Sequence, residues 1–415
     1  MELLRFFTAG NVDDGKSTLI GRLLYDSNSI STDIIETLSR QSKTVGVDSE
    51  IDLALLTDGL RAEREQGITI DVAYKYFSTD KRKFIIADTP GHAQYTRNMF
   101  TGASNADLAI ILIDARNGIT EQTKRHSIIS SILGIPHILI CVNKMDLVDY
   151  KESVFKDIKS DYLKFSKRLG LKEISFIPVS ALTGDNVVKS SDNLSWFKGE
   201  SLFEFLENVD IQSVNDSQDV RFQVQYVIRP QTEELHDYRG YAGSVLSGTI
   251  NKGDRVQILP LDVTTNIEKI EKFEQEVQVA EEGDPIVIHL TDDLDVSRGS
   301  TIVNLDERPI TDNVIEATIC WMDNKSYQKG QKLLLQQNSF RSKVSIKEVE
   351  AQLDIHTFDH VSCEESMNLN DFYKVILKTA EPISYDPYSK NRKTGSFILI
   401  NENSNNTVAA GIING

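Results

Sequence analysis

The chain has 415 residues, which is too long for one hydrophobic core and predicts two to four domains. Its 62 acidic and 45 basic residues give a net charge of −17, which disfavours nonspecific nucleic-acid binding because that binding depends on neutralising phosphates. No apolar run reaches the length of a membrane span, the histidines show no zinc-like cluster, and the three scattered cysteines suggest thiols in a reducing cytoplasm.

The first predicted elements surround a phosphate-binding motif. Residues 3–9 form an apolar run that predicts a buried strand, and a helix is predicted from residue 18 onward. Between them, residues 10–17 match the pattern G-x-x-x-x-G-K-[ST]. Such a strand, turn and helix start direct backbone N–H groups and the positive end of the helix dipole at an anion. The expected nucleotide contacts are Gly10, Asn11, Val12, Asp13, Asp14, Gly15, Lys16, Ser17 and Thr18.

Three side chains in and after this motif have specific expected roles. Lys16 is expected to reach the β- and γ-phosphates, and the Ser17 hydroxyl is expected to bind Mg²⁺. A polar insertion over 27–61 precedes Thr69. After a phosphate-binding loop, Thr69 is the candidate residue that senses Mg²⁺ and the γ-phosphate, although taken alone it also fits an ordinary strand threonine.

The next predicted strands lead to a second loop. Strands are expected over 70–77 and 84–87, and the second is followed by Asp88. An acidic residue there can hold the Mg²⁺ shell, usually through water, and Gly91 can turn its N–H toward the γ-phosphate. His92 either orients the attacking water or is a turn histidine. The nucleotide contacts expected from this loop are Asp88, Thr89, Pro90, Gly91 and His92.

A third loop predicts the identity of the base. Strands are expected over 108–113 and 138–142, with a helix over 121–133 between them. The second strand is followed by Asn143, Lys144, Met145 and Asp146. The Asp146 carboxylate can accept hydrogen bonds from guanine N1–H and the 2-amino group. Adenine lacks both donors, so ATP would leave the carboxylate unpaired at a cost of about 1–3 kcal/mol. Asn143 is expected at the other edge of the base, and the Lys144 stem on its ring face.

The remaining elements of the first half complete an α/β domain. A helix is expected over 152–169, a strand over 174–179 and a closing helix over 201–206. The tripeptide after the strand is expected to direct its backbone N–H groups at the guanine oxygen, and it consists of Ser180, Ala181 and Leu182. Strands that alternate with helices predict a doubly wound, mainly parallel sheet with ligands at the strand ends.

The pattern changes after a polar linker at 210–220. Short apolar or alternating runs follow, separated by turns rich in Gly and Asp, and they occur at 222–228, 256–259, 286–288, 344–349, 373–377 and 395–400. This close spacing predicts two antiparallel β-barrels. The stretch His236–Tyr241 is expected to be a hairpin loop, with a partner contact as the alternative. We therefore expect a phosphate-binding α/β domain and two barrel domains, over residues 1–212, 213–308 and 309–415.

The order of these motifs resembles the translation-factor GTPases of the elongation factor Tu type over nearly the whole chain. More narrowly, the chain is similar to the family of GTPase subunits of sulfate adenylyltransferase, the CysN type. The resemblance rests on GNVDDGKS at 10–17, DGLRAEREQGITIDVAY at 58–74, DTPGHAQYTRNMFTG at 88–102 and DYRGYAG at 237–243. Translation factors of this type usually carry an acidic residue two positions after the histidine, whereas this chain has Gln94.

The resemblance implies a set of ligands and a hydrolytic mechanism. GTP and Mg²⁺ are the implied cofactors, with Ser17 and Thr69 as Mg²⁺ ligands beside the Asp88 expected above. Val12 and Ile68 are implied to form an apolar gate at the hydrolytic water. His92 is implied to move between them and position that water.

The resemblance also implies a partner. In that family a separate small catalytic subunit joins ATP and sulfate into adenosine 5′-phosphosulfate and pyrophosphate, and GTP hydrolysis in the large subunit drives this uphill reaction. We therefore expect a cytoplasmic heterodimer or larger assembly, with no membrane and no nucleic-acid partner. The sequence shows no second phosphate-binding motif, so we expect no kinase activity. The alternatives are a translation factor that delivers aminoacyl-tRNA and a stand-alone regulatory GTPase.

Overall fold

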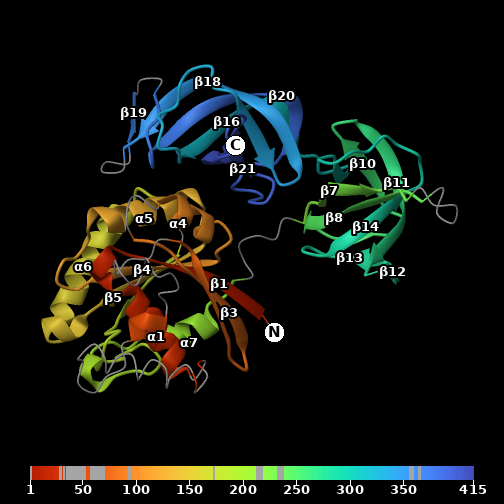
Figure 1. Ribbon diagram of the computed structural model, residues 1–415. Helices are drawn as coiled ribbons and strands as arrows, with labels where there is room; N and C mark the ends of the chain where they lie inside the picture. Colours follow the sequence, from red (N-terminus) through yellow and green to blue (C-terminus); the bar gives the residue numbers. More distant parts are fainter. Residues whose placement is uncertain are drawn as a thin grey trace. The chain divides into compact units, whose positions relative to one another are not determined.

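The computed structural model describes most of the chain. The described residues are 2–27, 30, 33, 53–56, 71–91, 96–171, 173–211, 218–230, 238–273, 275–354, 359–362 and 366–415. They form two compact units, and among them the first unit ends at Ile211 and the second begins at Gln218 (Figure 1). No helix among these residues is both long enough and apolar enough to cross a membrane.

The first unit is built on a six-stranded sheet with the order β2-β3-β1-β4-β5-β6. Its strands are β1 (Glu2–Ala9), β2 (Ala73–Ser78), β3 (Arg82–Asp88), β4 (Leu108–Asp114), β5 (His137–Asn143) and β6 (Glu173–Pro178). Every pairing is parallel except the antiparallel pair β2–β3. The carboxyl ends of the parallel strands therefore share one edge of the sheet, where a doubly wound fold binds its ligands.

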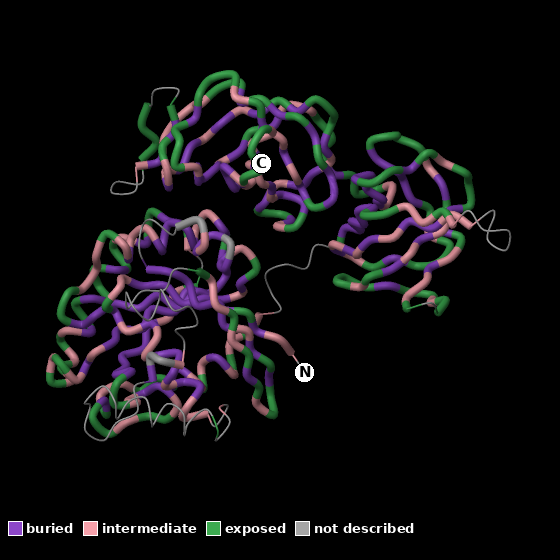
Figure 2. Tube along the Cα trace, in the orientation of Figure 1, coloured by how far each residue is buried: buried purple, intermediate pink, exposed green. Residues whose placement is uncertain are grey.

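Helices cover both faces of this sheet (Figure 1). They are α1 (Lys16–Asp26), α4 (Thr96–Ala103), α5 (Glu121–Ile132), α6 (Glu152–Ser166) and α7 (Leu202–Asn208), with 3-10 turns η1 (Val12–Asp14), η2 (Leu53–Leu56), η4 (Met145–Val148) and η5 (Asp192–Leu194). Leu19 and Leu23 of α1 share one core cluster with Leu202 and Leu206 of α7. Because both faces are covered, β4 and β5 are buried at every residue, as the purple strands in Figure 2 show.

The helix ends follow local chemistry. α7 begins at a capping box, in which Ser201 Oγ accepts a bond from Glu204 N at 3.3 Å and the Glu204 carboxylate accepts one from Ser201 N at 2.9 Å. α6 ends at Ser166, three residues before the predicted end at residue 169. The difference arises because the chain turns there and reaches Gly170, whose φ of 62° is not helical.

The second unit contains two antiparallel barrels, which confirms the predicted fold class. The first has the order β10-β15-β7-β8-β14-β11, and the pairing of β11 with β10 closes it. Its strands are β7 (Arg221–Ile228), β8 (Gly240–Ser247), β10 (Arg255–Leu259), β11 (Val263–Lys272), β14 (Pro285–Leu290) and β15 (Thr301–Asn304). Three short strands accompany them, namely β9 (Ile250–Asn251), β12 (Gln275–Val277) and β13 (Val279–Ala280).

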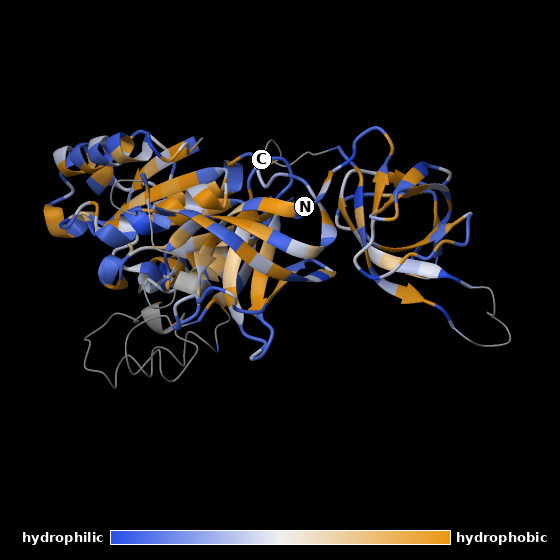
Figure 3. Ribbon diagram, turned by 90° about the horizontal axis from the view of Figure 1, so that it is seen from above, coloured by the Kyte–Doolittle hydropathy of each residue, from blue (hydrophilic) through white to orange (hydrophobic). Residues whose placement is uncertain are grey.

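The second barrel has the order β17-β21-β22-β16-β20-β18, closed by the pairing of β18 with β17. Its strands are β16 (Ile310–Trp321), β17 (Leu333–Gln337), β18 (Phe340–Leu353), β20 (Phe372–Tyr385), β21 (Ser396–Asn401) and β22 (Thr407–Ile413), with the short β19 (His360–Val361) beside β18. Residues of β18 alternate between buried and exposed along its first half. Figure 3 shows hydrophobic and hydrophilic residues alternating along several strands.

A buried polar cluster joins the two barrels. The fully buried Arg221 of β7 donates from Nε and Nη2 to the two carboxylate oxygens of Asp386, at 2.9 and 2.8 Å. Gln223 lies beside it and accepts bonds at 2.8 Å from the backbone N and from Oγ of Ser339. Strand β7 of the first barrel is thus tied to Asp386, just after β20, and to Ser339, between β17 and β18, by buried directional bonds, and burial strengthens such bonds.

Candidate functional site

The loop between β1 and α1 forms a tight cradle. It turns through η1, and Gly15 then takes a φ of 88° as helix α1 begins at Lys16. A Cβ at Gly15 would lie 2.6 Å from Asn143 Nδ2, so both the backbone angle and the space require glycine. Asn11 holds the turn, because its N donates to Asp14 Oδ2 at 2.6 Å and its side chain accepts from Val12 N at 2.9 Å.

The Lys16 ammonium lies at the centre of this cradle. Its Nζ donates to the carbonyl oxygens of Gly10 and Asn11 at 3.0 and 2.9 Å. The side chain is buried, and burial lowers the pKa of Lys16 while nearby carboxylates, Asp88 first among them, oppose the shift. A Cβ at Gly91 would lie 2.5 Å from Lys16 Nζ and 2.3 Å from Gly10 O. The loop after β3 therefore meets the phosphate-binding loop at the lysine tip.

The end of β3 is tied to the end of β1. Thr8 and Asp88 are register partners in the parallel pair, and Thr8 Oγ1 donates to Asp88 Oδ1 at 3.2 Å. Thr89 Oγ1 donates in turn to Thr8 O at 2.6 Å. Asp88 and Thr89 are buried, whereas Ser17 in the first turn of α1 is half-buried. These bonds fix a buried carboxylate in the same region as Lys16.

Asn143 connects three loops at the end of β5. Its Nδ2 donates to Asp14 O in the phosphate-binding loop at 2.8 Å, and its Oδ1 accepts from Ala181 N at 2.9 Å. Ser180 Oγ donates to Asp146 Oδ1 at 2.7 Å, and Met145, the residue before Asp146, is buried. The structure therefore brings the three predicted motif loops together at the carboxyl edge of the sheet.

Lys144 occupies an unusual position. Its backbone is left-handed, with a φ of 62° and a ψ of 37°. Its Nζ donates to Asp13 O in the phosphate-binding loop and lies 3.1 Å from Asp114 Oδ2. A left-handed lysine is conformationally costly and persists only where its surroundings fix it, which is typical of functional sites.

Sequence reasoning did not assign a role to Asp114, Arg116 or Arg22. Asp114 ends β4 and its side chain is only 1% exposed. Burial alone would raise the pKa of Asp114, but hydrogen bonds from Arg116 and Lys144 outweigh it and lower the pKa to about 2. Arg22 of α1 donates to the carbonyl oxygens of Ala181 and Leu182. The position of Asp114 at a strand end of a parallel sheet was the one signal that could have indicated its place.

Part of the predicted site lies outside the described residues. Ile68, Thr69 and His92 belong to this part, as does Gln94. Val12 is described and lies half-buried at the start of η1.

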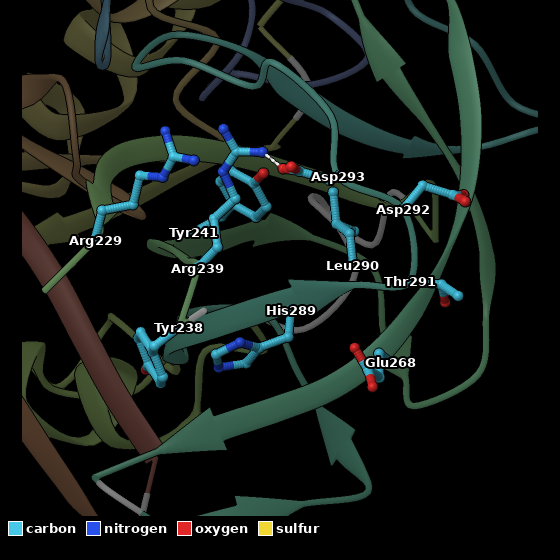
Figure 4. A pocket seen from close by; sticks show the side chains of 10 residues that line it. All are labelled: Arg229, Tyr238, Arg239, Tyr241, Glu268, His289, Leu290, Thr291, Asp292 and Asp293. Carbon is cyan, nitrogen blue, oxygen red and sulfur yellow. Dashed lines mark ion pairs between the residues drawn. The ribbon is translucent and has the colours of Figure 1, made fainter. Parts of the chain in front are cut away.

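A cavity of about 450 Å³ lies in the first barrel. It is lined by Arg229, Tyr238, Arg239, Tyr241, Glu268, His289, Leu290, Thr291, Asp292 and Asp293 (Figure 4). Arg239 forms an ion pair with the exposed Asp293. Gly240 and Tyr241, which were expected in a hairpin loop, instead begin strand β8, and His236 and Asp237 lie outside the described residues.

Several polar side chains at this cavity form hydrogen bonds with other residues of the first barrel. Tyr238 donates to Glu271 Oε2 at 2.8 Å, and His289 Nε2 lies 3.1 Å from the same oxygen. Burial and this bond raise the pKa of Tyr238 to about 12. The walls carry both signs of charge, so the cavity offers no simple anion or cation site.

Comparison with known proteins identifies the family. Residues 1–382 match the family of the elongation factor Tu GTP binding domain. The chain is 48% identical to sulfate adenylyltransferase subunit 1 of Bacteroides thetaiotaomicron, over 99% of this chain and 86% of that protein. The subunit of the same name from Alteromonas mediterranea is also 48% identical, over 99% of this chain and 87% of its own.

A bifunctional relative extends the comparison. The CysN/CysC enzyme of Mycobacterium tuberculosis is 48% identical, over 99% of this chain and 67% of its own length. These names support the expected sulfate adenylyltransferase resemblance over a translation factor that delivers aminoacyl-tRNA. The chain therefore belongs to the elongation factor Tu-type GTPases and, within them, to the sulfate adenylyltransferase subunit 1 family.

Proposed function

We propose that this protein is the GTP-hydrolysing subunit of a sulfate adenylyltransferase. The observation that carries the GTP assignment is the pair of hydrogen bonds through which Asn143 joins the phosphate-binding loop to the loop after β6. One side chain thereby sets the distance between the phosphate cradle and the base-reading residues. A guanine nucleotide that spans this distance meets donors and acceptors already fixed in place, which lowers the entropy cost of binding.

The phosphate half of the site fits a nucleoside triphosphate. We infer that Lys16 exchanges its bonds to the loop carbonyls for bonds to the β- and γ-phosphates, and that the start of helix α1 at the same loop adds the positive end of its dipole. Gly91 lies against Lys16, and we propose that its N–H binds the γ-phosphate. The contacts proposed here are Gly10, Asn11, Val12, Asp13, Asp14, Gly15, Lys16, Ser17, Thr18, Asp88, Thr89, Pro90, Gly91 and His92.

The residues present also fit Mg²⁺. A buried carboxylate, Asp88, and a half-buried hydroxyl, Ser17, are hard oxygen donors of the kind that Mg²⁺ prefers. We propose these two, with Thr69, as the residues that hold the ion directly or through water. When bound, the ion would neutralise charge on the β- and γ-phosphate oxygens.

The base half selects guanine. Ser180 orients the Asp146 carboxylate by donating to one of its oxygens, which leaves the other free to accept from guanine N1–H or the 2-amino group. We propose that Asn143 and Lys144 contact the other edge and the ring face, with the buried Met145 in the same loop. The backbone of Ser180, Ala181 and Leu182 would receive the guanine oxygen, with Ala181 N shared between that oxygen and Asn143 Oδ1. ATP would leave the Asp146 carboxylate unsatisfied, at a cost of about 1–3 kcal/mol.

The hydrolytic step is assigned to His92. We propose that His92 orients the attacking water in line with the γ-phosphate and that Val12 and Ile68 form an apolar gate beside it, with Thr69 sensing the γ-phosphate. Positioning of this kind is the main contribution a protein makes to phosphoryl transfer. The support is the family membership together with the position of Gly91, the residue before His92, at the tip of Lys16.

GTP turnover in this subunit is proposed to drive the sulfate reaction in a partner. Relatives at 48% identity are named subunit 1 of sulfate adenylyltransferase. We propose a cytoplasmic complex with a small catalytic subunit that joins ATP and sulfate into adenosine 5′-phosphosulfate and pyrophosphate. The proposed domains are 1–212 for GTP and 213–308 and 309–415 for the two barrels.

The test is made on the complex of this chain with the small subunit of the same source. Adenylylsulfate formation from ATP and sulfate is measured with GTP, without GTP and with a non-hydrolysable GTP analogue. We expect product to accumulate beyond the uncoupled equilibrium only with GTP, in step with phosphate release. Equal product in all three arms would contradict the coupling, and the absence of any GTP hydrolysis would contradict the GTPase assignment itself.

A further inference from the structure

We propose that Asp114 and Arg116 are positioning residues for the nucleotide site, because they hold Lys144 in place for the base. This inference rests on the proposed function, since it assumes that the Lys144 stem packs on the purine. Neither Asp114 nor Arg116 belongs to a motif that predicted nucleotide contact. Their role follows from three contacts that meet at the end of β4.

The Asp114 carboxylate is held by a fork of donors. Arg116 Nε donates to Asp114 Oδ1 at 3.0 Å, and Arg116 Nη2 donates to Oδ2 at 2.7 Å. The backbone N of Arg116 adds a third bond to Oδ1 at 2.9 Å. A bidentate guanidinium fixes both the position and the plane of a carboxylate. One face of Asp114 is therefore locked by a residue two positions away.

The other face of Asp114 is turned to Lys144. Asp114 and Asn143 are register partners in the parallel pair β4–β5, so the residue after Asn143 begins its turn directly beside Asp114. Lys144 Nζ lies 3.1 Å from Asp114 Oδ2 and donates to Asp13 O as well. One acceptor lies at the end of β4, and the other lies in the middle of the phosphate-binding loop. Together, these two acceptors fix the position of the Lys144 ammonium and therefore the path of its aliphatic stem.

The contacts that hold the Lys144 ammonium affect binding because a lysine side chain is flexible. A free lysine side chain samples many rotamers, and ordering it on a ligand opposes binding. Here the left-handed backbone of Lys144 aims the side chain, and the buried Asp114 holds its end. The stem is thereby arranged before the base arrives. Arg116 contributes by preventing the Asp114 carboxylate from rotating away from the ammonium.

The contacts do not indicate that the Arg116 guanidinium serves only to hold the turn after β4. The turn after β4 is held by backbone bonds from Asn117 N and Gly118 N to Asp114 O, each at 3.0 Å. These bonds do not involve the guanidinium. The Arg116 side chain is 48% exposed, so its removal leaves little buried space. Its two side-chain bonds instead act on the one carboxylate that contacts Lys144.

The experiment is a double-mutant cycle on the full chain, read by equilibrium binding of fluorescent GDP and GTP. The variants are Arg116→Ala, Lys144→Ala, both together, and Arg116→Lys, with Lys164→Ala on the exposed face of α6 as the control. Thermal unfolding of each variant is measured in parallel. If Arg116 acts through Lys144, its effect must vanish once Lys144 is gone.

We expect Arg116→Ala to raise the dissociation constants of GDP and GTP by about tenfold and by equal factors, because the lysine stem contacts the base and not the phosphates. Arg116→Lys should recover part of the loss, since it restores one charged donor without the fork. The double variant should bind within about twofold of Lys144→Ala.

Three results would overturn the inference. They are unchanged binding by Arg116→Ala, a loss that persists in full in the Lys144→Ala background, and a loss for GTP alone. Wild-type protein that binds no guanine nucleotide would instead contradict the proposed function, and the positioning role would fall with it.

Discussion

Asn143 and Asp14 are joined by a hydrogen bond of 2.8 Å, from the side-chain amide at the end of β5 to a backbone carbonyl of the phosphate-binding loop. The two residues are 129 positions apart in the chain. Both the amide and the carbonyl are buried, and the other end of the same amide accepts from Ala181 N. A single side chain therefore joins the phosphate-binding loop to the loop after β6.

Replacing Asn143 by alanine should weaken both binding and folding. The change leaves Asp14 O and Ala181 N without partners in a buried region, and each unpaired group costs about 1–3 kcal/mol. We expect the dissociation constant of GDP to rise by at least about tenfold and the free energy of unfolding to fall. Titration calorimetry and urea unfolding measure the two effects. Asn208→Ala, at the exposed end of α7, is the control, and equal behaviour of the two variants would refute the bridging role.

The substitution Asp146→Asn should change base preference. An amide donates where the carboxylate accepts, so it pairs with the 2-oxo group of xanthine and repels the 2-amino group of guanine. We expect preference to move from GTP toward xanthosine triphosphate, by a factor of about ten or more, measured by competition binding. A variant that still prefers GTP would show that Asp146 does not contact the base.

The substitution His92→Ala should separate hydrolysis from binding. If His92 only orients the attacking water, its loss slows GTP hydrolysis by about a hundredfold or more and leaves GTP affinity near the wild-type value. Single-turnover hydrolysis and equilibrium binding are measured on the same preparation. A comparable loss of affinity would make His92 a residue that supports the loop, and not one that acts on the water.

The stability of the two barrels should depend on Arg221. Removing this guanidinium leaves Asp386, whose side chain is 3% exposed, as an uncompensated buried charge. We expect Arg221→Ala to lower the free energy of unfolding by about 3–5 kcal/mol, and Arg221→Met with Asp386→Leu to recover much of that loss. Urea unfolding monitored on the two tryptophans provides the measurement, with Arg341→Ala, at an exposed position of β18, as the control. If the double variant is as unstable as the single one, the charge is not the cause.

Lowering the pH should reduce the free energy of unfolding, in part because the Asp114 carboxylate becomes protonated. The pKa of Asp114 is about 2 in the folded chain, below its ordinary value of 3.8. The carboxylate therefore contributes stability above about pH 4, on the order of 2 kcal/mol, and this contribution is lost as the pH falls toward 2. Asp114→Asn should be less stable at neutral pH and should lose less on acidification. Unfolding free energies at pH 7 and pH 3 test this, and parallel losses in both proteins would contradict it.

The local pattern of apolar and polar residues was sufficient to predict many of the strands and helices. The alternation at 222–228 predicted β7 to within one residue, but the burial of β7 does not alternate, because its first four residues are all buried and include the polar Arg221 and Gln223 that bond to the second barrel. The apolar run at 108–113 predicted β4, because a parallel strand is buried on both faces. The end of α6 was placed three residues late, because the polar segment that follows is also compatible with a helix.

The nucleotide motifs could be predicted for the same reason. A phosphate cradle needs glycine, lysine and a hydroxyl at short, fixed spacing, so the requirement is written in consecutive residues. The contact of Asp114 with Lys144 is of another kind. The two lie 30 positions apart, and neither has a neighbour pattern that points to the other.

The sequence by itself determined which elements form, their order and which motif residues each loop carries, because these depend on residues close together in the chain. Only the tertiary structure decided that Arg116 reaches Lys144 through Asp114, that Asn143 spans two loops, and that Arg221 meets Asp386 from 165 residues away. Such contacts depend on strand register and barrel closure, and these are set by the packing of the whole domain and not by any single segment.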